Sequence, residues 1–321
     1  MVGQISSIFD PASSGAALIR DLSGLVLWIC LGIFVVTQVG LIWVIVRFRA
    51  RPGDEGHEPP QVYGSTQVEL AWTIVPLIIV LVLFLTTART IGEIEDREPG
   101  PGSLEVLVVG HQWWWEIRYP GRGVVTANEL HVPRSSAAAP HTTFIDLRSA
   151  DVIHSFWIPQ LAGKTDLIPG HDNRMWLEPD RTGVFLGQCA EFCGTQHARM
   201  GLRVVVEEPA EFERWLTAQR ATPAVPATAS AAARGRDIFS TTSCVNCHTL
   251  EGAGGDGRFG PDLSHLMSRA TLGAGAAANT PVNLRAWVRD PQTLKPGCNM
   301  PDMKLSEPEV DAVVAYLLTL G

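Results

Sequence analysis

The sequence has neither an excess of positive charge nor a disulfide framework. Its 33 acidic side chains outnumber the 25 basic ones and give a net charge of −8, so we expect no nucleic-acid partner. Of its six cysteines, one lies in an apolar run, one stands alone, and two pairs have histidines nearby. There is no internal repeat, and no basic secretory signal precedes the first apolar run. Either that run serves for targeting, or a signal has been removed.

Charge is missing altogether from two long stretches near the N-terminus, residues 22–46 and 70–88. Each is close to the ~20 residues that a helix needs to cross a bilayer. Pro76 interrupts the second stretch, but neighbouring helices can satisfy the carbonyl that it frees. The alternative, two buried helices of a soluble protein, is disfavoured because two such runs lie so close together. After a short segment, 1–21, we therefore predict a transmembrane hairpin over 22–92, with helices of about 22–47 and 69–90.

The loop between the two apolar runs carries positive charge. Arg47, Arg49 and Arg51 follow the first run directly. Because cytoplasmic loops are enriched in arginine and lysine, this favours a hairpin with both termini outside the cytoplasm.

The remaining chain changes character twice. Residues 93–216 contain short β-rich runs at 104–109, 142–147 and 202–206, separated by Pro and Gly, which predicts an all-β sandwich or barrel closed by a helix at 210–219. A linker rich in Pro, Ala and Thr follows over 217–233. Residues 234–321 have helical patterns, including a capping box at Ser306–Glu309, which predicts an all-α domain.

Soft metal ligands gather in one short stretch of the β-rich region. Cys189, Cys193, His197 and Met200 lie within twelve residues, and His154 lies 35 residues before the first of them. Thiolate, thioether and imidazole all suit copper, so we interpret this stretch as a copper electron-transfer site. A disulfide between the two cysteines is the alternative, but it needs neither histidine nor methionine. A mononuclear blue-copper site needs only one cysteine, so the second argues against it.

A second cofactor motif lies in the C-terminal region. Cys244-Val245-Asn246-Cys247-His248 has the spacing of a c-type haem attachment site, in which the histidine binds the iron. A thioredoxin-like redox pair is the rival, but no βαβ pattern surrounds the motif. We expect Met300, on a loop between two prolines, as the sixth iron ligand, with Met303 as the alternative.

These features together resemble subunit II of the haem-copper cytochrome c oxidases over residues of about 22–216, with a fused cytochrome c over 234–321. The resemblance implies a cupredoxin-like Greek-key domain with a binuclear copper A centre. Six residues would hold the coppers: His154, Cys189, Glu191 through its backbone carbonyl, Cys193, His197 and Met200. The Glu191 side chain would reach a magnesium ion shared with subunit I.

Two further residues match functional positions of that family. Trp113, in Gly110-His111-Gln112-Trp113-Trp114-Trp115, stands where the family has its electron-entry tryptophan, although an aromatic cluster of a β-sandwich is the plainer interpretation. Glu69, just before the second apolar run, resembles the glutamate at the mouth of a proton channel. An acid at a membrane boundary is otherwise just a solvated helix start.

One departure from the family bears on the partners. Members that recruit a soluble basic cytochrome c have extra acids after the aromatic segment, whereas this chain has Arg118 and Arg122 there. We therefore expect the fused haem to deliver electrons to the copper within the chain. A cytochrome c or a bc-type complex would reduce that haem.

The resemblance implies the electron-entry subunit of a respiratory oxidase in a bacterial plasma membrane, with both redox domains and both termini on the periplasmic side. Its partners would be subunit I, with haem a and copper B, the other oxidase subunits and membrane lipid. Oxygen chemistry and proton pumping would occur in subunit I. The electron-transfer subunit of a copper A-type nitric oxide reductase and a membrane-anchored copper-binding protein remain alternatives. A quinol-oxidase subunit II is excluded, because such subunits lack the copper ligands that are present in this sequence.

Overall fold

The computed structural model describes residues 7–53, 56, 60–61, 63–100, 102–251 and 255–321. The chain forms two compact units, one from Ala17 to Glu98 and one from Pro99 to Gly321 together with the residues before Ala17.

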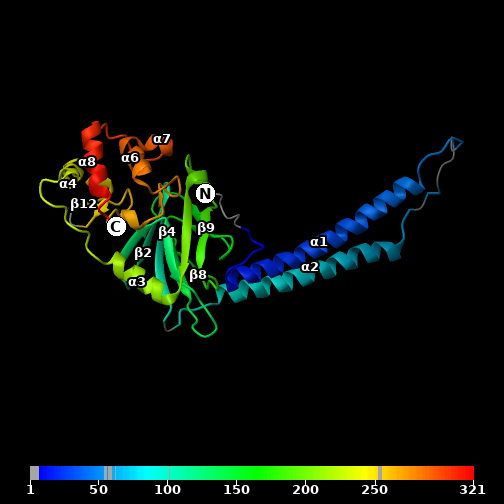
Figure 1. The fold of residues 1–321 in the computed structure, drawn as a ribbon. Coiled ribbons are helices and arrows are strands. Elements are labelled where there is room, and N and C mark those ends of the chain that lie inside the picture. The colour runs from blue at the N-terminus through cyan, green and yellow to red at the C-terminus, as the bar shows by residue number, and fades with distance from the viewer. Residues whose placement is uncertain (1–6, 54–55, 57–59, 62, 101, 252–254) are drawn as a thin grey trace. The chain divides into compact units, whose positions relative to one another are not determined.

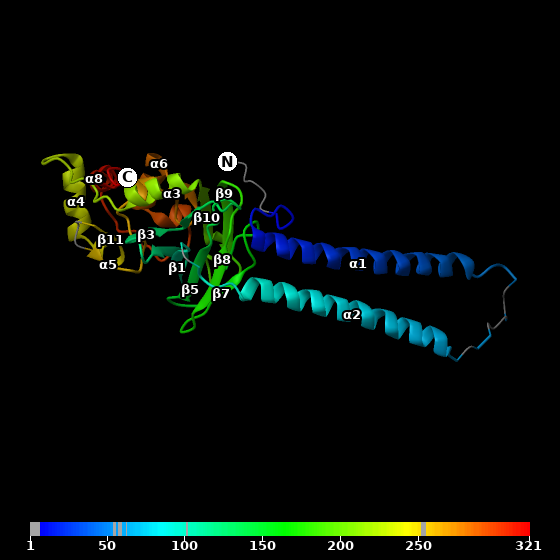
Figure 2. The same ribbon diagram turned by 90° about the horizontal axis from the view of Figure 1, so that it is seen from below.

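The first unit consists almost entirely of helices α1 (Ser14–Arg47) and α2 (Thr66–Glu95), which run alongside each other as a hairpin (Figure 2). Both are long and apolar enough to cross a membrane, and their most apolar windows have no buried residue. Large side chains such as Phe34 and Val36 are exposed around the helices, 59% and 72% respectively. A helix that is apolar on all sides needs an apolar environment, which a bilayer supplies. Both helices extend beyond the predicted 22–47 and 69–90.

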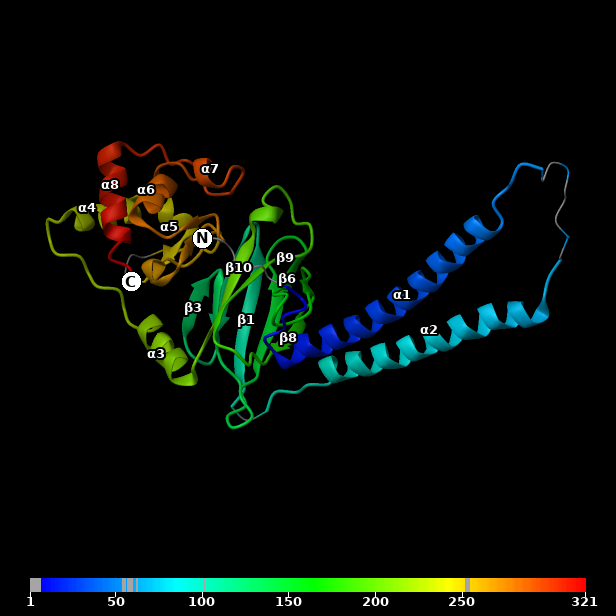
Figure 3. The ribbon, with the colours of Figure 1, turned by 45° about the vertical axis from the view of Figure 1, so that its right-hand side comes forward.

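The second unit begins with a β-sandwich closed by one helix, which we call the sandwich domain (104–219; Figure 3). One sheet has the strand order β3-β2-β1-β5-β8 and the other β4-β10-β9-β6-β7. Two of the strand pairs, β1 with β5 and β10 with β4, are parallel. The strands are β1 Leu104–His111, β2 Trp114–Tyr119, β3 Val124–Ala127, β4 Glu129–Pro133, β5 Thr143–Ser149, β6 His154–Trp157, β7 Thr165–Leu167, β8 Asn173–Leu177, β9 Gly183–Cys189 and β10 Gly201–Glu207.

The sandwich is held together by the inward-facing residues of both sheets. On β1, Val106 and Val108 are buried while their neighbours are more exposed, as the two-residue period of a strand requires. They share one core with Leu130 of β4 and Val204 of β10. Helix α3 (Pro209–Gln219) joins the same core through buried Phe212 and Leu216.

The segment before α1 belongs to this unit as well. Ala12 is fully buried and its N–H donates to the carbonyl of Gln160 at 2.7 Å. Asp10 forms an ion pair with Arg181 at 3.1 Å. The sequence did not predict these contacts.

The second unit ends with a helical part, which we call the C-terminal domain (231–321; Figure 1). It has its own hydrophobic core. Helices α4 and α8 approach closely at Gly235, where a Cβ atom would lie 1.9 Å from the carbonyl oxygen of Ala312. The predicted capping box is present, with Ser306 and Glu309 bonded to each other's backbone. The elements are α4 Ala231–Thr241, α5 Cys244–Cys247, β11 Thr249–Leu250, β12 Gly255–Asp256, η2 Leu266–Ser268, β13 Thr271–Leu272, β14 Ala277–Ala278, α6 Pro281–Arg289, α7 Pro291–Leu294 and α8 Glu307–Leu317.

Candidate metal centre and haem-attachment segment

The pairing of two strands brings His154 beside the segment that carries Cys189 and Cys193. His154 begins β6, and β6 pairs with the end of β9 so that Phe156 lies opposite Cys189. The loop between β9 and β10 then carries the remaining predicted ligands, with one turn of 3-10 helix, η1 (His197–Arg199), before Met200. Residues 35 positions apart in the sequence are thus neighbours, on a loop held by two rigid strands.

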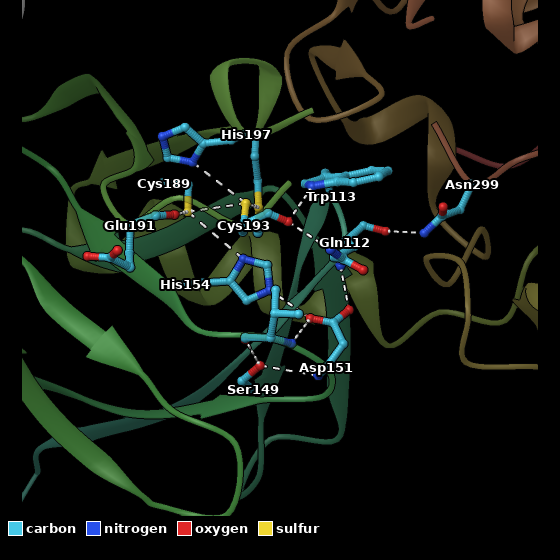
Figure 4. Close-up of polar contacts among 12 residues, drawn as sticks. Gln112, Trp113, Ser149, Asp151, His154, Cys189, Glu191, Cys193, His197 and Asn299 are labelled. Carbon is cyan, nitrogen blue, oxygen red and sulfur yellow. Dashed lines mark hydrogen bonds and ion pairs between the residues drawn. The ribbon is translucent and has the colours of Figure 1, made fainter. Parts of the chain in front are cut away.

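The side chains of this loop converge on the two sulfurs (Figure 4). The sulfurs of Cys189 and Cys193 lie 3.8 Å apart and both thiols are free, so the alternative of a disulfide is wrong for this structure. Beside Cys189 Sγ lies His154 Nδ1, at 3.9 Å. Beside Cys193 Sγ lie His197 Nδ1 at 3.6 Å and Met200 Sδ at 3.8 Å. The ligand atoms of His154, Cys189 and Cys193 all lie within 4.8 Å of one another, close enough to share a metal.

Glu191 presents its two oxygen-bearing groups in opposite directions. Its backbone carbonyl oxygen lies 3.2 Å from Cys189 Sγ. Its side chain is exposed, and in Figure 4 the carboxylate points away from the sulfurs. The carbonyl therefore faces the candidate metal centre, while the carboxylate remains available to another ligand.

The electrostatics of the cluster favour a thiolate at Cys189. Hydrogen bonding from the Cys193 thiol, with further help from His154 and two backbone groups, outweighs burial and lowers the pKa of Cys189 to about 3. The same contact raises the pKa of Cys193, because a thiolate lies beside it. Burial would lower the pKa of His154, but hydrogen bonds with Asp151 and Cys189 raise it. A thiolate beside imidazoles is a ligand set that suits soft metals.

Two residues that sequence reasoning missed orient this cluster. Asp151 Oδ1 lies 2.8 Å from His154 Nε2, which leaves Nδ1 facing Cys189. Gly110 leaves room for the buried ring, since a Cβ there would lie 2.9 Å from His154 Cδ2. A carboxylate three residues before a metal-binding histidine is the signal that could have identified Asp151.

Trp113 lies directly beside the cluster. Its indole Nε1–H donates to the carbonyl of Cys193 at 2.9 Å, and the Gln112 side-chain amide donates to the same oxygen at 2.7 Å. The ring is half-buried and packs against the sandwich core. The sequence predicted this residue for electron entry, and the structure brings it to a predicted copper ligand.

In the C-terminal domain, α5 presents the predicted haem-attachment residues. Cys244 and Cys247 are both free and half-buried at its two ends. The next residue, His248, bonds through Nδ1 to the carbonyl of Pro261 at 2.8 Å, which leaves Nε2 for a metal. Gly260 accommodates this ring, because a Cβ there would lie 2.5 Å from His248 Cε1. Burial lowers the pKa of His248, so the neutral, metal-binding form is favoured.

Three other sequence predictions are located but not tested by these contacts. Met300 and Met303 are both half-buried on the loop between α7 and α8, so the choice of axial ligand stays a prediction. Glu69 lies exposed in the first turn of α2.

Comparison with known proteins covers most of the chain in three parts. Residues 3–88 match the family described as cytochrome C oxidase subunit II, transmembrane domain. Residues 138–208 match cytochrome C oxidase subunit II, periplasmic domain, and residues 232–321 match cytochrome c. These parts agree with the hairpin, the sandwich domain and the C-terminal domain.

Individual relatives extend the match along nearly the whole chain. The chain is 36% identical to cytochrome c oxidase subunit 2 of Alkalihalophilus pseudofirmus, over 86% of this chain and 80% of that protein. It is 33% identical to the Bacillus sp. PS3 subunit 2, over 85% and 80%. It is 32% identical to the Bacillus subtilis subunit 2, over 97% and 90%. The chain therefore belongs to the family of cytochrome c oxidase subunit II, with a cytochrome c domain fused at its C-terminal end.

Proposed function

We propose that this chain is the electron-entry subunit of a terminal respiratory oxidase. Electrons would pass from an external donor to haem c in the C-terminal domain, then to a binuclear copper centre in the sandwich domain, and finally to haem a of subunit I. Subunit I would reduce oxygen to water and couple this reaction to proton pumping. The observation that carries the proposal is the convergence of two free thiols, two imidazoles and a thioether beside Trp113.

The arrangement of donors supports two metals rather than one. A metal–thiolate bond is about 2.3 Å long, taking zinc as the guide. Since the two sulfurs are 3.8 Å apart, both can lie within bonding distance of the same pair of metals. The imidazoles of His154 and His197 lie beside different sulfurs, so each can serve one metal. The Glu191 carbonyl, beside Cys189, and the Met200 sulfur, beside Cys193, would then complete the set.

The haem segment offers a matching set. Cys244 and Cys247 would bind the porphyrin covalently, His248 would bind the iron through Nε2, and Met300 would be the sixth ligand, which raises the potential of cytochromes c. When bound, the two cofactors supply reversible one-electron chemistry. The protein contributes rigid placement, because Pro261 fixes the ring of His248 and Asp151 fixes that of His154.

Residues around the cofactors take supporting roles in the proposal. Trp113, bonded to the Cys193 carbonyl, would be the point at which electrons enter the sandwich domain. The exposed carboxylate of Glu191 would bind a magnesium ion shared with subunit I. Glu69 would lie at the mouth of a proton channel formed with subunit I.

We place both redox domains and both termini on the periplasmic side of a bacterial plasma membrane. Arg47, Arg49 and Arg51 between the helices support this orientation. The haem-attachment motif at 244–248 and the loop between β9 and β10 both follow α2 in the sequence, so they lie on the same side of the membrane. A cytochrome c or a bc-type complex would be the donor.

Metal analysis of the purified full-length chain tests the proposal. We expect two coppers and one haem per chain. Cys193→Ser should lose copper and keep haem, whereas Cys298→Ser, outside both ligand sets, should keep both. One copper in the wild type would contradict the binuclear assignment. Co-purification with a partner that contains haem a would support an oxidase over a nitric oxide reductase.

A further inference from the structure

The sandwich domain has a buried carboxylate whose hydrogen-bond donors come from the C-terminal domain. Glu129, at the start of β4, is 4% exposed. Its carboxylate accepts hydrogen bonds from the backbone N–H of Ala270 at 2.9 Å and of Thr271 at 3.0 Å, and from the Thr271 hydroxyl at 3.2 Å. A carboxylate buried so deeply is destabilising unless donors surround it. All three of these donors come from the C-terminal domain.

A buried lysine makes the reciprocal contact. Lys295 is 3% exposed, and its ammonium donates to the carbonyl of Trp113 at 2.9 Å and to that of Gly273 at 2.9 Å. One oxygen belongs to the sandwich domain and the other to the C-terminal domain. Lys295 therefore fixes the loop before Cys298 to the backbone of the predicted electron-entry residue.

A third contact links the two predicted ligand sets. The side-chain amide of Asn299, next to Met300, donates to the carbonyl of Gln112 at 2.8 Å. The side-chain amide of Gln112 in turn donates to the carbonyl of Cys193 at 2.7 Å. Figure 4 shows Asn299, Gln112 and Cys193 in line, with the indole of Trp113 hydrogen-bonded to the carbonyl of Cys193. Hydrogen bonds thus connect a neighbour of the predicted haem ligand to a predicted copper ligand.

We propose that Glu129, Lys295 and Asn299 form a docking interface that holds the C-terminal domain against the Gln112–Trp113 edge of the sandwich domain. In this interface, Lys295 and Asn299 are positioning residues for electron entry. This inference rests on the proposed function. Each transfer moves one electron from haem c, which is oxidised, to the copper pair, which is reduced, and no bond or proton is exchanged. Because Lys295 and Asn299 occupy the carbonyls of Trp113 and Gln112, an external donor has to dock on the C-terminal domain.

Hydrogen exchange on the full chain tests the docking alone. The peptide that contains Ala270 and Thr271 should be protected in the wild type, and Glu129→Gln should speed its exchange at least tenfold. Glu213→Gln, which removes an exposed acid of the same domain, should leave the exchange unchanged. Unchanged hydrogen exchange in the Glu129→Gln variant would overturn the proposed docking interface. This measurement needs no assumption about electron transfer, so it can succeed even if the proposed function fails.

Rapid kinetics on the metal-loaded chain test the positioning role. Lys295→Met and Asn299→Ala should each slow electron transfer from haem c to copper at least tenfold, while haem and copper spectra and direct reduction of copper by ascorbate stay unchanged. Lys295→Arg, which retains a donor, should recover most of the rate. Arg234→Met removes the same charge from an exposed position of α4 and should have no effect. Asn299 is exposed, so its variant should fold even if Lys295→Met does not. An unchanged rate of electron transfer in Asn299→Ala would overturn the positioning role of Asn299. If Lys295→Arg transfers electrons as slowly as Lys295→Met, the positioning role of Lys295 is overturned.

Discussion

His154 is a fully buried imidazole whose orientation depends on one carboxylate. Asp151 bonds its Nε2 atom and also accepts the backbone N–H groups of Gln112 and Val152. It therefore fixes the histidine and the strand end beside it together. Sequence reasoning predicted His154 as a ligand but missed Asp151. The position of Asp151 three residues before His154 was a signal, but the contact itself depends on a turn between β5 and β6 that the residue pattern does not specify.

Asp151→Ala should weaken copper binding without removing a ligand. Loss of a carboxylate behind a metal-binding histidine typically reduces metal affinity by about 10–100-fold. We expect a loss of that size in a copper titration of the full chain followed by absorbance. The matched control is Asp172→Ala, which removes an exposed acid of the same domain that pairs with Arg148. Equal affinity in the two variants would show that Asp151 does not orient the ligand.

Glu116 is a second acid with an unusual environment. Burial alone would raise its pKa, but hydrogen bonds from His111 and Arg118 outweigh burial and lower it to about 2, from an ordinary value of 4.5. Between these values the unfolded chain binds more protons than the folded one. The stabilisation is therefore complete above about pH 4.5 and is lost as the pH falls toward 2.

Glu116→Gln should consequently lower the free energy of unfolding at pH 7, by at most about 3 kcal/mol. The difference from the wild type should shrink as the pH falls from about 4.5 toward 2. Urea unfolding of the full chain in detergent, at several pH values, measures this. Glu213→Gln, at an exposed ion pair, should change the free energy by less than about 1 kcal/mol at every pH. A difference in Glu116→Gln that does not vary with pH would contradict the assignment.

At the scale of elements, the strands were predicted better than the ends of the membrane helices. The expected runs at 104–109, 142–147 and 202–206 correspond to β1, β5 and β10, because alternation of buried and exposed residues is a local property. Helix α1 instead begins at Ser14, where Ser13 Oγ accepts the N–H of Ala16 at 3.1 Å. Hydropathy placed the start at 22 because Arg20 and Asp21 are charged, yet a helix can continue through charged residues outside the apolar layer.

The loop between α7 and α8 contains both candidates for the sixth ligand of the haem iron. Met300 and Met303 are both half-buried there, and Gln292 donates to the carbonyl of Met300 at 2.9 Å. This bond ties Met300 to α7, whereas none of the described residues forms a hydrogen bond with the backbone of Met303. The hydrogen bond holds the backbone of Met300 in place, and Met300 stays the predicted axial ligand.

Met300→Ala should abolish the charge-transfer absorption of a low-spin methionine-ligated haem and lower the haem potential. Met303→Ala, the matched control on the same loop, should retain the band and the potential. Spectra of the oxidised chain together with a redox titration make the comparison. If Met303→Ala loses the band and Met300→Ala keeps it, the axial ligand is Met303.

At the scale of the whole chain, composition and motifs were sufficient to predict a hairpin, a β-sandwich and a cytochrome c domain, because each has its own periodicity or ligand spacing. The contacts between the last two domains were not predictable. Glu129, Lys295 and Asn299 resemble surface residues in the sequence, and only the fold shows that two of them are buried. Long-range contacts of this kind leave no local pattern.

The membrane orientation can be tested through the distribution of lysine. The chain has three lysines, Lys164, Lys295 and Lys304, and all of them follow the second helix. In spheroplasts, a membrane-impermeant amine reagent should label the exposed Lys164 and Lys304, while the buried Lys295 should remain unlabelled. Peptide mass spectrometry distinguishes the three. Arg49→Lys adds a target in the loop between α1 and α2, and it should be labelled only in inverted vesicles. Labelling of that loop in spheroplasts would reverse the proposed orientation, because the positive charge of the loop would then face the periplasm.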